Sequence, residues 1–141
     1  MPNYLDLFAG AGGLSEGFLQ AGYTPIAHIE MDKAACYTLK TRVAATWLRA
    51  HNQEEEYDAY LRGEYSRENF YDLIPQKELG SVLQCELSEA TLPSVFQYID
   101  NRLGGQQLDM IVGGPPCQAY SIAGRARSHT KMVGDKRNYL Y

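Results

Sequence analysis

The sequence has no long apolar run, little sulfur and no excess of positive charge. None of its hydrophobic stretches approaches the roughly 20 apolar residues of a membrane span, and its first residues, Met1–Tyr4, do not resemble a signal peptide. Three cysteines, an odd number, make no disulfide framework and are typical of a reducing cytoplasm. With 13 Lys and Arg against 17 Asp and Glu, the net charge of -4 is unfavourable for autonomous binding to DNA phosphates.

The remaining composition is typical of one compact globular domain. The chain has 141 residues, of which 45% are hydrophobic and 21% are charged. These values lie in the ordinary range for soluble proteins and exclude a disordered, collagen-like or coiled-coil chain. The length suits a single domain with a sizeable core.

Short apolar runs alternate with helical patterns along the chain. This alternation predicts a parallel sheet of βαβ units, in which ligands bind beyond the carboxyl ends of the strands. Asp32 is a suitable N-cap, and Leu39, Val43 and Trp47 give the helix that follows it an apolar stripe. Strands are predicted at 4–8, 25–29, 82–85 and 108–112, and helices at 14–20, from 33 to about 50, and at 92–103.

The segment 51–80 is polar and rich in aromatic residues, and it interrupts the alternation as an insert. We expect one or two short helices here, broken at Gly63 and stopped by Pro75. The aromatic side chains are expected to pack into a small helical cluster rather than to contact DNA.

A glycine-rich turn follows the first predicted strand. Gly10 and Gly12 allow a ligand to approach the backbone closely, but Ser15 stands where a dinucleotide fingerprint has its third glycine. Glu30, about 20 residues further on, can accept hydrogen bonds from ribose hydroxyls. Because no basic residue is present and Asp6 would repel phosphate, S-adenosylmethionine suits the turn better than NAD. The alternative is a tight turn that binds nothing.

Cys117 follows Pro115 and Pro116 at the end of the fourth predicted strand. Prolines stiffen the backbone and fix the direction of the thiol, so Cys117 is a candidate nucleophile. The alternative is an inert thiol, which is how we interpret Cys36 and Cys85, since both lie within apolar patterns.

Together these motifs resemble those of the cytosine-5 DNA methyltransferase family, in the family's order and spacing. The resemblance rests on residues 6–13, 29–32, 113–118 with Ser121 and Gly124, and 135–140. It implies a Rossmann-like S-adenosylmethionine-dependent methyltransferase fold, here as the N-terminal half of a mainly parallel sheet flanked by helices. It also implies methyl transfer from S-adenosylmethionine, with S-adenosylhomocysteine as product, to C5 of a flipped cytosine in duplex DNA.

The resemblance further implies residue roles. The Cys117 thiolate attacks C6 of cytosine, C5 takes the methyl group, and loss of the C5 proton expels the cysteine. No metal ligands are implied. The residues implied to bind the cofactor are Phe8, Ala9, Gly10, Ala11, Gly12, Gly13, Glu30, Met31, Glu86, Leu87, Pro116 and Leu140. Those implied to bind the substrate are Pro116, Gln118, Ser121, Arg125 and Arg127.

Some of these roles have equal alternatives. Ser121, Arg125 and Arg127 would also suit a solvated basic loop. Glu86 stands where the family usually has an Asp near the adenine, but it is equally well a surface glutamate.

The resemblance also has gaps. No Glu-Asn-Val motif follows in the family's order, and no target-recognition region is present. We therefore expect residues 1–141 to form part of a catalytic domain that is inactive alone. It would need a C-terminal half or second subunit, or would self-associate, in a cytoplasmic, nucleoid-associated restriction-modification system of a prokaryote. The alternatives are a non-catalytic S-adenosylmethionine-binding module or remnant and, more weakly, a nucleotide-dependent oxidoreductase.

Overall fold

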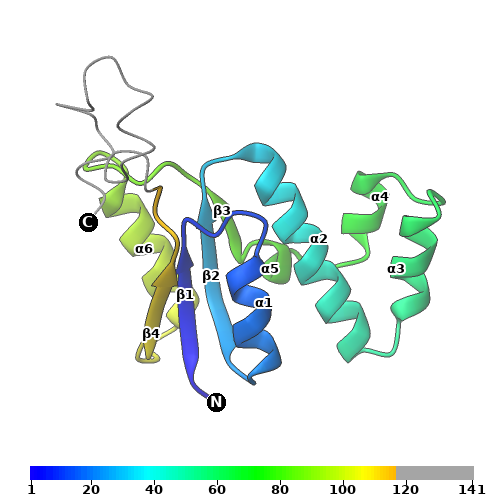
Figure 1. Cartoon of the computed structure of the whole chain (residues 1–141), viewed down its shortest axis with the longest axis horizontal. Helices are drawn as coiled ribbons and strands as arrows, with labels where there is room; N and C mark the ends of the chain where they lie inside the picture. Colours follow the sequence, from blue (N-terminus) through cyan, green and yellow to red (C-terminus); the bar gives the residue numbers. More distant parts are fainter. Residues whose placement is uncertain (117–141) are drawn as a thin grey trace.

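The computed structural model describes residues 1–116, which form a parallel sheet flanked by helices (Figure 1). The sheet has four strands in the order β3-β2-β1-β4, and every neighbouring pair is parallel. The predicted α/β class is therefore confirmed. The strands are β1 (Asn3–Leu7), β2 (Thr24–Glu30), β3 (Val82–Gln84) and β4 (Met110–Gly113). The helices are α1 (Gly13–Gln20), α2 (Lys33–Ala50), α3 (Glu54–Leu61), α4 (Arg67–Asp72), α5 (Gln76–Leu79) and α6 (Leu92–Leu103).

The two faces of the sheet bury different chemistry, because side chains alternate along each strand. On one face, Leu5 and Ile29 pack against Val95 and Ile99 of α6 in an apolar cluster. On the other face, Tyr4 lies against Phe18 of α1, with ring centroids 5.1 Å apart. None of the helices in residues 1–116 is long and apolar enough to cross a membrane.

β4 begins two residues later than the sequence predicts. At this point, bonds to the side chains of Asn3 and Asp109 take the place of backbone–backbone bonds between β1 and β4. The Asn3 N–H donates to Asp109 Oδ2 at 2.8 Å, and the Asp109 N–H donates to Asn3 Oδ1 at 2.9 Å. Regular pairing then starts with Tyr4 opposite Met110. An apolar run alone does not reveal such a pair of side-chain bonds.

The two halves of α2 pack against different parts of the molecule. Near its start, Leu39 packs with Ala9 and Val82 at the edge of the sheet. Near its end, Ala44 and Leu48 pack with the helices that follow. Of the predicted stripe, Leu39 is buried, whereas Val43 and Trp47 are half-buried. The helix therefore serves two separate clusters, which a single stripe could not predict.

The segment 51–80 contains three short helices rather than the one or two predicted. α5 is the additional helix, and Pro75 stands at its N-cap instead of ending helical structure. The aromatic residues do pack together, as expected: Phe70 is fully buried and stacks on Tyr60 with ring centroids 4.2 Å apart.

A glycine at the end of β4 provides a test of the sheet. A Cβ added at Gly113 would overlap the carbonyl oxygen of Leu7 in β1. Gly113→Ala should therefore lower the free energy of unfolding by about 1–3 kcal/mol, measured by urea denaturation. Gly114→Ala is the matched control, because a Cβ there meets nothing within 4 Å. Equal effects of the two substitutions would contradict the close approach of β4 to β1.

Candidate cofactor site at the sheet edge

The carboxyl ends of the four parallel strands meet at one edge of the sheet, where open α/β sheets bind ligands. Four segments lie at this edge: the turn 8–12 after β1, residues 31–32 after β2, residues 85–87 after β3 and residues 114–116 after β4. Most of the predicted cofactor residues belong to these segments.

The glycine turn has an unusual backbone. Phe8, Gly10 and Gly12 all have positive φ, at 56°, 55° and 85°. A Cβ added at Gly12 would lie 2.9 Å from Cδ2 of Leu39, so a larger residue is excluded by both conformation and space. Positive φ is uncommon for a residue such as Phe8, and strained backbone of this kind clusters at functional sites.

Glu30 connects this turn to the loop after β2. Its Oε2 accepts the Gly10 N–H at 2.8 Å, and its Oε1 accepts the Asp32 N–H at 2.8 Å. Asp32 in turn caps α2, because its Oδ1 accepts the Ala35 N–H at 2.7 Å. A carboxylate has about four acceptor positions, so each Glu30 oxygen retains capacity for a further donor, such as a ribose hydroxyl.

The segment after β3 lies beside Glu30. The Cys85 N–H donates to the Glu30 carbonyl oxygen at 2.9 Å, which ties the residue before Glu86 to the end of β2. Glu86 is exposed, and Met31 is 61% exposed. Leu87 differs from these two, because its side chain packs against the apolar cluster under α6. Of the other predicted residues, Ala9 is buried, Ala11 and Gly13 are exposed, and Pro116 is half-buried.

A buried carboxylate lies in β1, just before the turn. Asp6 is 1% exposed, and within residues 1–116 neither of its oxygens has a hydrogen-bond partner. Burial, and then the charge of Glu30, raises the pKa of Asp6 to about 6. At neutral pH the carboxylate is therefore mostly ionised and places negative charge under the turn. This charge disfavours phosphate and favours a cationic ligand.

Ser15 occupies the position of the missing third glycine and is the centre of a buried polar cluster. Its Oγ hydrogen-bonds to the Tyr4 hydroxyl and, at 2.8 Å, to Nε2 of His28. Burial, and then the charge of Arg102, lowers the pKa of His28 to about 4. The cluster ties α1 to β1 and β2. The sequence does not predict this cluster, because Tyr4, Ser15 and His28 lie in three different elements.

The remaining predicted site residues lie outside the described residues. They are Cys117, Gln118, Ser121, Arg125, Arg127 and Leu140.

The described part of the chain has the parallel α/β fold of Rossmann-like methyltransferases, with its candidate site at the carboxyl edge. A family model described as C-5 cytosine-specific DNA methylase matches residues 3–64 and 94–141. The chain belongs to this family, as the sequence motifs predicted.

Curated relatives are consistent with that assignment. The chain is 39% identical to the type II methyltransferase M.Bpa9945I of Bacillus paralicheniformis, over 97% of this chain and 35% of the relative. It is 30% identical to the type II methyltransferase M1.HphI of Haemophilus parahaemolyticus, over 98% of this chain and 26% of the relative. The chain thus spans about a third or less of these relatives. No solved structure matches it.

The buried carboxylate gives a pH-dependent prediction. The pKa of Asp6 is about 6 in the folded protein and 3.8 ordinarily, so the folded state loses stability as the pH rises through this interval. Asp6→Asn removes this cost. The substitution should raise the free energy of unfolding by roughly 1–3 kcal/mol at about pH 8 and by much less at about pH 4. Urea denaturation across this pH range measures the difference.

Asp100→Asn on α6 is the control, because Asp100 is exposed and its substitution should have no comparable trend. In Asp6→Asn the opposite trend of His28 should become visible. Its pKa falls from 6.5 to about 4 on folding, so stability decreases as the pH falls through that interval. A pH-independent effect of Asp6→Asn would show that burial does not penalise this carboxylate.

Proposed function

We propose that this chain binds S-adenosylmethionine at the glycine turn and provides the nucleophile that methylates C5 of cytosine in DNA. The observation that carries the proposal is the Glu30 carboxylate, which holds the turn through Gly10 at 2.8 Å and keeps acceptor capacity on both oxygens. Membership of the C-5 cytosine-specific DNA methylase family supports the reaction.

The residues at the sheet edge suit this cofactor. The turn from Ala9 to Gly13 consists of alanine and glycine, which lets a ligand approach its backbone, and Glu30 can accept the ribose hydroxyls. Met31, which is 61% exposed, is available to pack against the adenine. The ionised Asp6 favours a ligand with sulfonium and ammonium groups. The bound cofactor supplies an activated methyl group, whereas NAD would bring a pyrophosphate close to the carboxylate.

We further propose the role of Cys117. Its thiolate adds to C6 of a flipped cytosine, C5 then accepts the methyl group, and loss of the C5 proton restores the double bond and releases the thiolate. Pro116 shapes the pocket for the base, Leu140 and Leu87 complete the cofactor pocket, and Glu86 lies near the adenine. Gln118, Ser121, Arg125 and Arg127 contact the DNA substrate.

In this proposal, residues 1–141 form one part of the catalytic domain of a restriction-modification methyltransferase. Residues 51–80 form an insert within that part. Within residues 1–116, β4 is an edge strand, and its Ile111 is 60% exposed. Phe96 on α6 is 59% exposed. Such apolar surface supports contact with further protein, either a C-terminal half or second subunit, or another copy of the chain.

A trapping experiment tests the reaction. Duplex DNA that contains 5-fluorocytosine should form a covalent adduct with the chain, assembled with any partner, in the presence of S-adenosylmethionine. The adduct should disappear in Cys117→Ser, whereas cofactor binding measured by calorimetry should remain. Cofactor binding without an adduct would indicate a non-catalytic binding module. Better protection against thermal unfolding by NAD than by S-adenosylmethionine would refute the proposed cofactor.

A second prediction concerns Glu30. Glu30→Gln replaces one acceptor oxygen by a donor and removes the charge, and hydrogen bonds to charged groups contribute about 1.5–3 kcal/mol. We expect S-adenosylmethionine to bind roughly 10- to 100-fold more weakly, measured by calorimetric titration. Glu89→Gln is the matched control, because Glu89 is exposed on the loop before α6. Unchanged affinity in Glu30→Gln would exclude the ribose contact.

A further inference from the structure

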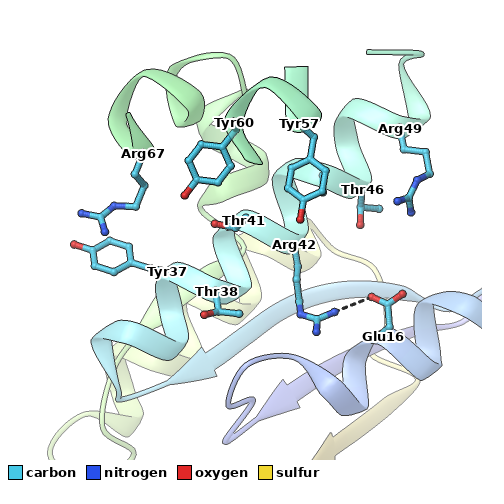
Figure 2. A pocket seen from close by; sticks show the side chains of 11 residues that line it. Glu16, Tyr37, Thr38, Thr41, Arg42, Thr46, Arg49, Tyr57, Tyr60 and Arg67 are labelled. Atoms are coloured by element: carbon cyan, nitrogen blue, oxygen red, sulfur yellow. Dashed lines mark hydrogen bonds and ion pairs between the residues drawn. The ribbon is translucent and has the colours of Figure 1, made fainter. Parts of the chain in front are cut away.

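A groove of about 530 Å³ lies away from the sheet edge, between α2 and the helices of the insert (Figure 2). α2 forms its floor, α3 and α4 form one wall, and Glu16 of α1 lies on the opposite side. The family model leaves residues 65–93 unmatched, and these include α4 and its groove residue Arg67. The other ten lining residues lie within the matched segment 3–64, and none of them belongs to the candidate cofactor site at the sheet edge.

The groove concentrates positive charge in an acidic chain. Arg42, Arg49 and Arg67 line it, and they are three of the five arginines in residues 1–116. Glu16 is the one acidic residue among the lining side chains of the described chain. Arg42 pairs with Glu16 at 3.3 Å, and the side chains of this pair are 45% and 41% exposed. Such exposed pairs are weak and can exchange for another anion.

The other arginines are also held in exposed pairs. Arg49 lies 3.8 Å from Glu54, and Arg67 lies 3.2 Å from Glu68. Neither glutamate lines the groove. Among the residues that line the groove, only Glu16 would therefore compete with a bound anion for the guanidinium groups.

Three tyrosines line the groove, and two of them have one ring face covered by a neighbour. The ring of Tyr60 is stacked on Phe70 at 4.2 Å, and that of Tyr37 lies under the guanidinium of Arg67 at 3.7 Å. Figure 2 shows the hydroxyls of Tyr57 and Tyr60 directed toward α2, above Arg42 and Thr41. One ring face of Tyr60 and one of Tyr37 are thus covered, which reduces the aromatic surface available for stacking unpaired bases.

The lining chemistry is therefore dominated by hydrogen-bond donors. Guanidinium groups donate only, and the hydroxyls of Tyr57, Tyr60 and Thr46 can donate as well. The complementary ligand is an anion rich in acceptor oxygens. Phosphate fits this description, and arginine binds it in a bidentate manner.

The spacing of the cations indicates an extended ligand. Arg42 and Arg49 are seven residues apart, which places them on one side of α2 about 10.5 Å apart along its axis. Arg67 lies over Tyr37, five residues before Arg42, so the array extends for about 18 Å. A single phosphate cannot span this length, whereas the backbone of a nucleic acid can.

The walls of the groove are fixed by packing and hydrogen bonds. The Tyr71 hydroxyl of α4 donates to the Tyr37 carbonyl oxygen at 2.9 Å and lies 3.1 Å from Oγ1 of Thr41. Phe70 is buried between the tyrosines and α2 in a cluster that includes Ala44. The donors are thus held in place before any ligand binds, which reduces the entropy lost on binding.

We propose that this groove binds the phosphodiester backbone of duplex DNA, at a position separate from the base that is methylated. The inference rests on the proposed function only in taking DNA as the ligand. The groove reads no bases and contributes affinity that depends on salt, because each phosphate contact releases counterions. It offers this acidic chain a local cationic surface for its substrate.

The test compares DNA binding by two double variants of the full chain. Arg49→Gln with Arg67→Gln removes two groove cations, and fluorescence anisotropy measures its affinity for a labelled duplex without a target site. Near 0.1 M salt we expect binding to weaken roughly 10- to 100-fold, and the slope of log affinity against log salt to decrease in magnitude by about 2. The matched control is Arg62→Gln with Lys77→Gln, which removes the same charge from insert positions outside the groove.

Several outcomes separate this inference from the reaction itself. Thermal unfolding checks that both double variants are folded. Their affinity for S-adenosylmethionine should be unchanged, because the groove does not include the proposed cofactor residues. Equal affinity of the groove variant and the control would overturn the inference, as would a wild-type chain that binds no duplex. Competition by inorganic phosphate alone, or a loss seen only with single-stranded DNA, would also refute it. A groove effect without a Cys117 adduct would support the inference while rejecting the proposed methylation.

Discussion

The site at the sheet edge depends on one carboxylate. Glu30 ends β2, and its two oxygens accept N–H groups from the turn after β1 and from the residue that caps α2. Three elements thus converge on a single side chain. Bonds of this kind to a charged group are shorter and stronger than neutral ones. Together with the bond from the Ala9 N–H to the Ile29 carbonyl oxygen, they link a turn in which Phe8, Gly10 and Gly12 all have positive φ to β2 and α2.

The asymmetry of the sheet supports this arrangement. The face under α6 carries an apolar cluster in which Leu5, Ala27 and Ile29 are buried. The opposite face holds Asp6 and the Ser15 cluster, so polar groups are buried next to the turn. An ionised Asp6 reduces stability. In the proposed function, the same charge favours a cationic cofactor over one that carries phosphate.

The segment 51–80 illustrates how packing and surface chemistry can share residues. The ring of Phe70 stacks on one face of the Tyr60 ring, and Tyr60 also lines the groove. A buried aromatic cluster therefore orients polar groups at the surface. The sequence predicts that the aromatic residues of 51–80 pack into a small helical cluster rather than contact DNA. In the structure, the same rings complete a cationic groove whose arginines come from α2 and α4, which are distant in sequence.

The sequence by itself determined the fold class, the family and most strand positions, because strand alternation, glycine turns and ordered motifs are local signals. It also indicated that Glu30 follows the second strand, near the turn. Only the tertiary structure showed that Glu30 bonds to Gly10, that Ser15 joins Tyr4 to His28, and that β4 starts late because Asn3 and Asp109 pair. The burial of Asp6 and the alignment of Arg42, Arg49 and Arg67 in one groove were likewise decided by folding. These features arise from contacts between residues far apart in the chain. The free energy of such contacts is set by burial, and a local sequence pattern does not specify which residues become buried together.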